Sequence, residues 1–592
     1  MQTCLAGYGD DNREDSMVDN DKGKGLKRGL THYGDTGFSL FLRKSFAKSM
    51  GYTEQDLERP VIGIANTASG FNNCHRSVPD LIEAVKRGVM YGGGLPVEFP
   101  TISLGEPYLN PTSMLFRNLM AIDTEEMIRA QPMDAVVLIG GCDKTLPAQL
   151  MAAASVNLPA ISLVVGPMLT GSWRGERLGA CTDCRRQWGR YRAGELDDQQ
   201  IAEVGSELST TAGTCMVMGT ASTMALMTEA LGMMLPGGAT APAVHAERLR
   251  IAECTGERAV QIADKRLSPD EIMTPHAFSN AFRVLLAVGG STNSLIHMTA
   301  VAGRCGIKVD LGALDRMGRE TPVLVDLKPS GTNYMEDLHK AGGLATILRE
   351  LSPFLHLDCK TVTGRTLGEE IESARTWSQD IVRSIKSPLK PEGGIAVLTG
   401  NLAPETAIIK QSAATPELLV HEGRAVVFDS LEDLAERIDD PDLDVGEDDV
   451  LVLRNAGPKG APGMPESGYI PIPKKLAATG VKDMVRLSDA RMSGTAFGTI
   501  ILHVCPEAAV GGPLSLVQEG DRIQLDVPNR RLNLVVDDRI LEDRRSAWKP
   551  PTLPVGSERG YLRLHLDHVE QAHQGCDLDV LKPRSSGAIT PE

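Results

Sequence analysis

Over the first two thirds of the chain, short apolar runs alternate with amphipathic stretches. The runs at 60–65, 135–139 and 160–165 are nearly continuous in apolar residues and have strand length, which is typical of buried parallel strands. The stretch at 78–90 instead repeats its apolar residues at helical spacing. This alternation predicts a mainly parallel sheet with helices on its faces. The predicted strands are 60–65, 97–104, 135–139 and 160–165, and the predicted helices are 78–90, 111–122, 148–156, 216–235, 276–286 and 294–305.

The pattern changes near residue 385. Residues 387–394 are rich in Pro, Gly and Lys, which is typical of a linker. After it, 523–527 and 532–536 alternate apolar with polar residues around a turn-like segment, which indicates a hairpin. The fold class that follows is α/β with a second, β-rich and barrel-like part. Short strands are expected at 395–398, 425–428, 450–453, 523–527 and 532–536, and one more helix at 558–570.

These patterns predict four segments in the 592-residue chain. Length alone exceeds what one core usually supports. We expect a flexible N-terminal tail over residues 1–30 and an α/β domain over 31–385. A β-rich, barrel-like domain over 386–575 and a C-terminal tail over 576–592 complete the prediction.

Composition and net charge restrict the kinds of partner that the protein is expected to bind. Aromatic residues are only 4% of the chain and methionines number 23, so Ala, Leu, Val and Met must fill the core. The formal net charge of -16 disfavours a phosphate-backbone partner, and we expect no nucleic acid. The most membrane-like window, 216–235, contains Glu229 and several hydroxyl residues, so a buried helix is expected there and no membrane partner.

The eleven cysteines indicate a reduced compartment. Their odd number, their scatter over a long chain and a start without an apolar segment favour a cytoplasmic protein whose special cysteines are metal ligands or nucleophiles. Cys74, Cys142 and Cys215 stand in glycine-rich or polar turns, but their separations of 68 and 73 residues form no local metal motif. Cys181 and Cys184 form the only CxxC, which is either redox-active, a metal pair or merely structural.

The stretch from Gly140 to Thr145 carries the densest chemistry. It contains Cys142, Asp143 and Lys144 and lies between a predicted buried strand and a predicted helix. Ligands often bind at the carboxyl ends of strands in open α/β sheets. A soft thiolate beside a hard carboxylate would suit two different metal centres. The alternative is a strand-to-helix turn with a structural cysteine.

Several long segments in the same order resemble the dihydroxy-acid and sugar-acid dehydratase family. They are 66–74, 140–145, 213–224, 289–293, 455–466 and 488–498, so the resemblance runs from about residue 30 to 570. The segments 468–475 and 503–507 look like those of the sugar-acid branch, which acts on aldonates. The resemblance implies a hydro-lyase that removes water from a 2,3-dihydroxy carboxylic acid to give a 2-keto-3-deoxy acid.

The resemblance also implies two metal centres and a base. Three cysteines, rather than four, would leave an iron open as a Lewis acid, and a magnesium ion would acidify the C2 proton. In the family the lysine at the place of Lys144 is carbamylated, which turns a cation into a ligand. The implied cluster, most simply of the 2Fe-2S kind, is held by Cys74, Cys142 and Cys215; the Mg²⁺ ligands are Glu106, Asp143, Lys144 and Glu466; and the base is an alkoxide of Ser493.

Some positions depart from the family pattern or remain open. The family commonly has Asn-Pro-Cys-Asn where this chain has Asn-Asn-Cys-His at 72–75, and it usually lacks the cysteine pair at 181–184. Cluster type and substrate preference therefore stay open. His75, His245 and His297 are candidates for binding a polyol, since such a substrate needs buried polar partners. Asp489 and Arg491 would either orient the base loop or pair with the substrate carboxylate.

Two other functions remain as alternatives. The same scaffold serves branched-chain amino-acid biosynthesis, where 2,3-dihydroxyisovalerate becomes 2-ketoisovalerate. A non-catalytic iron-sulfur redox or sensor protein would use the same cysteines, although it would have no use for Ser493. For the enzyme we expect a small hydroxy-acid substrate and a homodimer or homotetramer.

Overall fold

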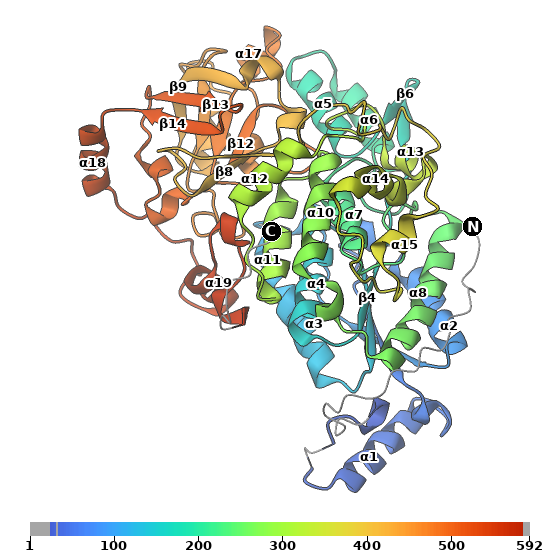
Figure 1. Cartoon of the computed structure of the whole chain (residues 1–592). Helices are drawn as coiled ribbons and strands as arrows, with labels where there is room; N and C mark the ends of the chain where they lie inside the picture. Colours follow the sequence, from blue (N-terminus) through green and yellow to red (C-terminus); the bar gives the residue numbers. More distant parts are fainter. Residues whose placement is uncertain (1–23, 31–32, 584–592) are drawn as a thin grey trace.

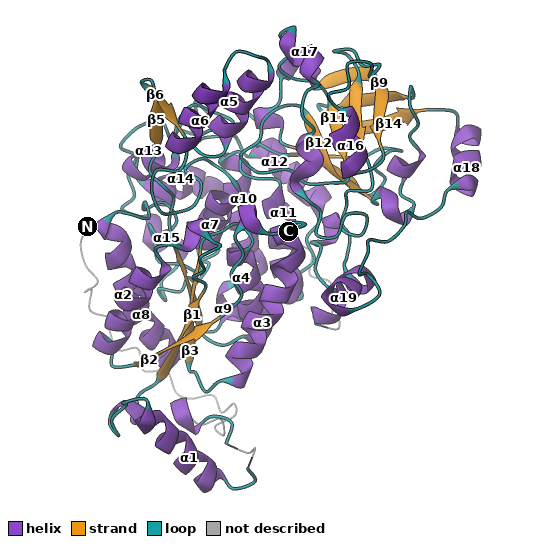
Figure 2. Cartoon of the chain, turned by 180° about the vertical axis from the view of Figure 1, so that it is seen from behind, coloured by secondary structure: helices purple, strands orange, loops and turns teal. Residues whose placement is uncertain are grey.

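A four-stranded parallel sheet forms the centre of the first part of the chain. The computed structural model describes residues 24–30 and 33–583. The strand order is β2-β1-β3-β4, and all neighbours are parallel. Helices α2 and α8 cover one face and α4 packs on the other (Figure 2). The predicted parallel sheet with flanking helices is confirmed. Its strands are β1 (Val61–Asn66), β2 (Leu95–Pro100), β3 (Ala135–Gly140) and β4 (Ala160–Val164).

Close packing of two helices covers that face. Helix α2 (Val78–Tyr91) lies against α8 (Ala246–Lys265), which the sequence analysis did not predict. A Cβ added at Gly88 would overlap the backbone carbonyl oxygen of Glu253, so only glycine permits this approach. Charged residues recur along α8, and even Arg248 is buried. A buried arginine obscures the hydrophobic stripe by which helices are predicted.

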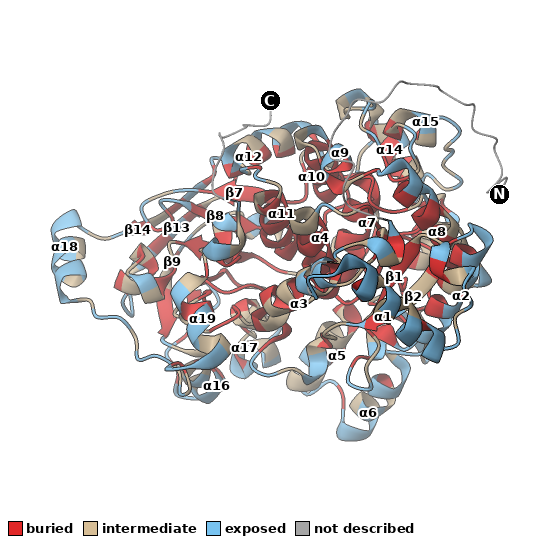
Figure 3. Ribbon diagram, turned by 90° about the horizontal axis from the view of Figure 1, so that it is seen from below, coloured by how far each residue is buried: buried red, intermediate tan, exposed pale blue. Residues whose placement is uncertain are grey.

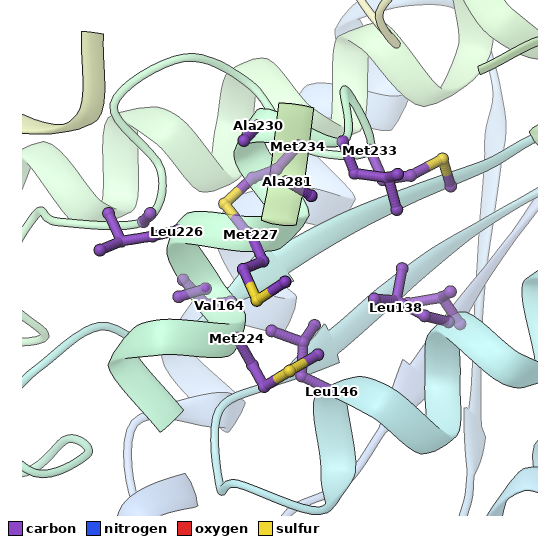
Figure 4. Packing of buried hydrophobic residues seen from close by; sticks show 14 of the residues in the cluster. Leu138, Leu146, Val164, Met224, Leu226, Met227, Ala230, Met233, Met234 and Ala281 are labelled. Carbon is purple, nitrogen blue, oxygen red and sulfur yellow. The ribbon is translucent and has the colours of Figure 1, made fainter. Parts of the chain in front are cut away.

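Methionines fill the space above the sheet, as the low aromatic content requires. Met224 and Met227 of α7 (Thr220–Ala230) are fully buried and lie near Leu138 of β3 and Leu146 of α4 (Figure 4). The predicted helix at 216–235 is shorter than expected because it begins only after Gly219. The burial map shows the same continuous buried interior running from the sheet through the central helices (Figure 3). Helix α4 spans Thr145–Val156.

The second part of the chain forms an eight-stranded sheet that nearly closes on itself. Strand order is β14-β13-β9-β10-β11-β12-β8-β7. The two edge strands meet where Thr399 pairs with Arg531, which brings the sheet ends together. The barrel-like prediction is therefore confirmed, including the antiparallel β13–β14 hairpin. The strands are β7 (Ala396–Leu398), β8 (Thr406–Ile409), β9 (Val420–Phe428), β10 (Val450–Leu453), β11 (Arg486–Ser488), β12 (Ile500–Cys505), β13 (Arg522–Asp526) and β14 (Arg531–Val535).

The remaining elements surround these two sheets. Helix α1 lies at one end of the molecule, and α18 projects beside the barrel (Figure 1). A search of the described residues finds no helix long and apolar enough to span a membrane. These elements are α1 (Thr36–Ser49), α3 (Arg117–Ala130), β5 (Gly171–Trp173), β6 (Glu176–Leu178), α5 (Thr182–Arg192), α6 (Asp198–Glu207), α9 (Pro269–Ile272), α10 (Pro275–Ala287), α11 (Asn293–Arg304), α12 (Leu311–Glu320), α13 (Met335–Lys340), α14 (Gly343–Leu351), α15 (Leu367–Ile371), α16 (Leu431–Arg437), α17 (Lys474–Ala478), α18 (Asp538–Ala547) and α19 (Gly560–His568).

The fold includes residues that the sequence analysis placed in the two tails. Gly25 is buried and its N–H donates to both carboxylate oxygens of Asp134 at 2.9 Å. At the other end, the fully buried Asp577 pairs with Arg304 at 2.5 Å. Polar anchors that sequence patterning does not reveal thus hold Gly25 and Asp577 within the fold, and the four-segment division with boundaries at 30 and 576 stays a prediction. Residues 1–23, 31–32 and 584–592 lie outside the described part.

Candidate functional site

Two loops at the carboxyl edge of the parallel sheet bring Cys74 and Cys142 together. Cys74 lies in a single helical turn, Asn73–His75, after β1, and Cys142 follows β3. Because parallel strands end at the same edge, the loops that follow them converge. The Cys74 thiol lies within hydrogen-bonding reach of the Cys142 thiol.

His75 fixes this pair. Its Nδ1 donates to the Thr67 carbonyl oxygen at 2.9 Å, and its Nε2 accepts the Cys142 backbone N–H at 3.0 Å. Burial lowers the pKa of His75 to about 4, although the bond to Thr67 opposes this shift. The ring is therefore neutral, and both nitrogens are used within the protein. His75 positions Cys142 and has no free nitrogen for a substrate hydroxyl, which excludes one of the roles considered for it.

Cys215 joins the same region from the loop before α7. Thr214 pairs with Pro167 just beyond β4, which brings the loop to the sheet edge. The Cys215 Sγ lies 3.6 Å from the Cys181 Sγ. The Cys184 thiol donates to the Cys181 carbonyl oxygen at 2.6 Å and also lies within hydrogen-bonding reach of the Cys181 thiol. The fold thus brings Cys74 to Cys142 and Cys181 to Cys215, contacts that spacing alone could not show.

Three carboxylates surround Lys144, whose side chain is fully buried. Its Nζ lies 3.1 Å from Glu106 Oε2 and 3.9 Å from Glu466 Oε1, and it contacts Asp143 directly. Burial lowers the pKa of Lys144 and so does Arg491, but the carboxylates prevail and raise it above its usual range. Lys144 is therefore a charged ammonium at the centre of the acidic group.

Arg491 completes this centre and links the two parts of the chain. Its guanidinium is fully buried and donates to Glu466 at 2.6 Å and to Thr112 at 2.7 Å, and it lies 3.6 Å from Glu106. From the sequence, Arg491 was a candidate without an assigned place in the site. Its position between Glu466 and Glu106 could not be foreseen, because more than 370 residues of chain separate Arg491 from its partner Thr112.

Buried charge explains how the carboxylates behave. Burial raises the pKa of Glu466. The positive charge of Arg491 opposes this shift, whereas the negative charges of Glu106 and Asp143 increase it. For Glu106, burial also acts to raise the pKa, but Lys144 and Arg491 together leave it lowered. Two cations thus face three carboxylates, and the group carries one net negative charge.

The donor types fit the two implied metal centres, but one residue must change. Carboxylates are hard ligands suited to Mg²⁺, and thiolates are soft ligands suited to iron-sulfur clusters. Among residues 24–30 and 33–583, however, no three His, Cys, Asp or Glu side chains form a ready metal site. The Lys144 ammonium stands where the three acids converge and would compete with a metal ion there. Converting that lysine to a carboxylate would remove the competing cation.

Ser493 lies in the loop after β11, and Glu466 lies in the loop after β10. These strands are parallel neighbours, so both loops leave the same edge of the barrel. The Ser493 Oγ lies 2.8 Å from Thr495 Oγ1. A Cβ on Gly494 would stand 2.5 Å from the Ser291 side chain, so this loop packs tightly against the 289–293 segment. From that segment Asn293 donates to Glu466 at 3.4 Å.

Lys410 lies beneath the Ser493 loop and was missed by the sequence analysis. Its ammonium is fully buried and donates to the Gly494 carbonyl oxygen at 3.1 Å. Burial lowers its pKa to about 7. No local motif surrounds Lys410, so only the fold reveals it.

The remaining candidate residues differ in whether they face the acidic group. Asp489 accepts the backbone N–H groups of Ala456 and Ala508, both at 2.9 Å, so it orients loops and does not face the acids. His297 is buried with its Nε2 unpaired among the described residues, and the charges of Lys144 and Arg491 contribute to lowering its pKa after burial itself.

Two more histidines lie at different distances from this centre. His503 is likewise buried with an unpaired Nε2 in the described part of the structure, and burial lowers its pKa to about 3. His245 instead meets the His339 ring edge to face at the start of α8, among groups unrelated to the acids. His297 and His503 thus remain as buried polar groups at the site, whereas His245 does not.

Comparison with known proteins assigns this arrangement to a family. Residues 59–370 match the family model of the dihydroxy-acid/6-phosphogluconate dehydratase N-terminal region, and residues 380–576 match that of the C-terminal region. The chain therefore belongs to the dihydroxy-acid/6-phosphogluconate dehydratase family and is an enzyme of the hydro-lyase class.

Relatives cover nearly the whole chain. L-arabinonate dehydratase of Rhizobium leguminosarum bv. trifolii is 48% identical over 561 residues, which cover 94% of this chain and 96% of the relative. 6-Deoxy-6-sulfo-D-gluconate dehydratase of Pseudomonas putida is 45% identical over 542 residues, or 91% and 93%. Dihydroxy-acid dehydratase of Acetivibrio thermocellus is less similar, at 39% over 544 residues, or 90% and 97%. The resemblance seen in the sequence is confirmed.

Proposed function

We propose that this enzyme dehydrates an aldonate to its 2-keto-3-deoxy acid. The observation that carries the proposal is the convergence of Glu106, Asp143 and Glu466 on the buried Lys144, beside the cysteine group. A structural role does not require three acids and two cations in one buried place, since buried charges are costly. A site that binds a carboxylate substrate through metal ions does.

The cysteines and acids would hold two metal centres. Cys74, Cys142 and Cys215 would bind an iron-sulfur cluster of the 2Fe-2S kind. The proposed Mg²⁺ ligands are Glu106, Asp143, Glu466 and a carbamylated Lys144. When bound, these groups would act as Lewis acids toward the leaving C3 hydroxyl and toward the substrate carboxylate with its C2 oxygen.

Carbamylation would make the site one that requires a cation. The Lys144 ammonium first loses a proton, and the neutral amine adds to the carbon of carbon dioxide: one N–C bond forms, the electron pair of one C–O π bond moves to oxygen, and a second proton leaves the nitrogen. The product is a carboxylate, so the acidic group loses its central cation. Four negative groups then face Arg491, a formal charge of −3, which a divalent cation would reduce to −1. The modification thus turns a competitor of the metal into a ligand.

Ser493 would take the C2 proton. A free serine hydroxyl is too weak an acid to work as a base, so its alkoxide must be stabilised. The Thr495 hydroxyl at 2.8 Å can donate a hydrogen bond to that alkoxide. Lys410 holds the intervening Gly494 carbonyl and so fixes the loop. The substrate would then lose its C2 proton to Ser493 and its C3 hydroxyl, which leaves as water after taking up one proton, the equivalent of the one taken by Ser493. The enol product then tautomerises to the keto acid.

The sugar-acid substrate is favoured over the branched-chain one. Relatives named for arabinonate and sulfogluconate are 48% and 45% identical, whereas dihydroxy-acid dehydratase is 39% identical. Buried polar groups without a partner are costly unless a ligand satisfies them. The Nε2 atoms of His297 and His503 are two such groups, and a polyol can satisfy them while an alkyl end cannot.

Turnover tests this proposal directly. Anaerobically iron-loaded protein with Mg²⁺ is incubated with aldonates of three to six carbons and with 2,3-dihydroxyisovalerate, and 2-keto acid formation is measured. We expect preference for an aldonate, and loss of turnover in Ser493→Ala with unchanged iron content. Preference for 2,3-dihydroxyisovalerate would move the enzyme to branched-chain biosynthesis. Absence of turnover with every acid at full iron content would contradict the proposed reaction.

We further propose a cytoplasmic homodimer or homotetramer. The exposed aromatic side chains of α1 support self-association, because Phe41 and Phe46 are 66% and 68% exposed. Light scattering on the purified protein tests the oligomeric state, and a monomer at micromolar concentration would contradict it. Cell fractionation tests the compartment.

A further inference from the structure

The cysteine pair that departs from the family pattern places one thiol at the cluster site. The Cys181 Sγ lies 3.6 Å from the Cys215 Sγ. Two thiolates on one tetrahedral metal, with bonds of about 2.3 Å, stand about 3.8 Å apart. The observed separation therefore suits two ligands of a single iron and is too long for a disulfide bond of about 2.05 Å.

The four thiols form two pairs. Cys74 lies within hydrogen-bonding reach of Cys142, and Cys181 lies beside Cys215. A two-iron cluster with four cysteines uses two thiolates per iron. Two pairs, rather than a group of three around one point, are what such a binuclear centre requires.

We propose that Cys181 is a fourth thiolate ligand of the cluster and shares one iron with Cys215 while no substrate is bound. The proposal rests on the proposed function, because that function supplies the cluster. It changes the expected resting state of the site, because Cys181 would have to withdraw before a substrate could bind to the iron that it shares with Cys215. The C3 hydroxyl of a substrate would then take the place that Cys181 leaves.

The surrounding contacts hold the Cys181 loop in place. Asp183 is buried and accepts hydrogen bonds from Lys328 Nζ at 2.8 Å and from Tyr334 Oη at 2.9 Å. This anchor aims the start of α5 at the cysteine group. Cys181 is therefore positioned by its neighbours and not by chance contact of a mobile loop.

A second contact connects this loop to the base. The Thr182 Oγ1 donates to the Thr495 carbonyl oxygen at 2.8 Å, and Thr495 also contacts Ser493. Movement of Cys181 away from the cluster would therefore act on the segment that carries the base. Binding of a substrate and positioning of Ser493 would be coupled through Thr182.

Cys184 provides a matched control. It belongs to the same CxxC and is equally intermediate in exposure, but its thiol donates to the Cys181 carbonyl oxygen. The Cys184 thiol also lies within hydrogen-bonding reach of the Cys181 thiol, but of the two it is Cys181 that contacts Cys215 in the described structure. A redox dithiol would need both cysteines to act together, so the two serine variants would behave alike.

The experiment counts sulfur neighbours of iron by X-ray absorption at the iron edge. Iron-loaded, substrate-free full-length protein is compared with Cys181→Ser and Cys184→Ser. We expect Cys181→Ser to lose one sulfur neighbour from one of the two irons and Cys184→Ser to match the wild type. Equal sulfur counts in the wild type and Cys181→Ser would overturn the proposal. Equal losses in both variants would also overturn it, in favour of a dithiol pair.

A second measurement needs no mutation. Wild-type protein is alkylated with and without prior removal of iron by a chelator, and the modified cysteines are mapped by mass spectrometry. We expect iron to protect Cys181 together with Cys74, Cys142 and Cys215, but not Cys184. Alkylation of Cys181 at the same rate in both samples, with iron present, would refute this proposal alone. A protein that binds no iron at all would refute the proposed cluster as well.

Discussion

Replacing Lys410 by Met should stabilise the metal-free protein and weaken catalysis. Lys410 is fully buried, and its ammonium has one hydrogen-bond acceptor in the described structure, the Gly494 carbonyl oxygen. Burial lowers its pKa from the ordinary 10.5 to about 7. A thioether of similar length fills the same space without a charge. The buried charge of Lys410 therefore lowers the stability of the fold. We infer that the lysine is present for its hydrogen bond to the Ser493 loop.

The magnitude follows from the pKa difference. At pH 7 the unfolded lysine is fully protonated, whereas the folded one is half protonated, which costs about 4 kcal/mol of folding free energy. In Lys410→Met the lost hydrogen bond to Gly494 lowers stability by about 1.5 to 2 kcal/mol, as for other hydrogen bonds to a charged group. We therefore expect the free energy of unfolding to rise by about 2 kcal/mol in Lys410→Met.

The pH dependence has a definite sign. Below 10.5 the unfolded state binds more protons than the folded state, so the stability of the wild type rises with pH. The penalty is largest below the folded pKa of about 7 and vanishes near pH 10.5. Between pH 7 and pH 9 the wild type should gain about 2 kcal/mol relative to Lys410→Met.

Urea denaturation of the metal-free, full-length protein at both pH values measures this difference. Lys549→Met serves as the control, because Lys549 is exposed on the barrel side of the chain. Turnover of the iron-loaded variant should fall, since Gly494 loses its anchor. A difference between wild type and Lys410→Met that stays constant from pH 7 to pH 9 would refute the reasoning.

Three further substitutions test other parts of the site and fold. Arg491→Met leaves Glu466 buried without its partner, so the free energy of unfolding in urea should fall by about 3–5 kcal/mol. His75→Leu removes the acceptor of the Cys142 N–H, which should lower stability by about 1–3 kcal/mol and reduce iron content after loading. Gly88→Val forces α2 away from α8 and should lower Tm, at a cost of about 1–3 kcal/mol.

Two of these changes have a control variant. Arg316→Met removes a side chain that is 71% exposed, so its effect on unfolding should be small. Gly70→Ala adds a Cβ that meets no atom within 4 Å, so Tm should stay near the wild-type value. Unchanged iron content in His75→Leu would mean that Cys142 does not depend on His75. Equal Tm in Gly88→Val and Gly70→Ala would contradict the close packing of the two helices.

The elements that the sequence revealed are those with strong local patterns. Strand β3 and helix α4 were predicted almost to their bounds, because a continuous apolar run and a Pro in the first turn are local signals. The β13–β14 hairpin was predicted for the same reason. By contrast α8, the longest helix in the described ranges, was missed, because buried Arg248 breaks its apolar stripe.

The sequence by itself determined the family, the kind of chemistry and the residues of the motifs. It did so because long segments in fixed order carry that information without any contact between them. Only the tertiary structure decided which side chains meet. Arg491 reaches Thr112, Lys410 lies under Ser493, and Cys181 lies beside Cys215 because the packed chain brings together loops that are distant in sequence. Such proximity depends on the whole packed chain, so no spacing along the sequence could reveal it.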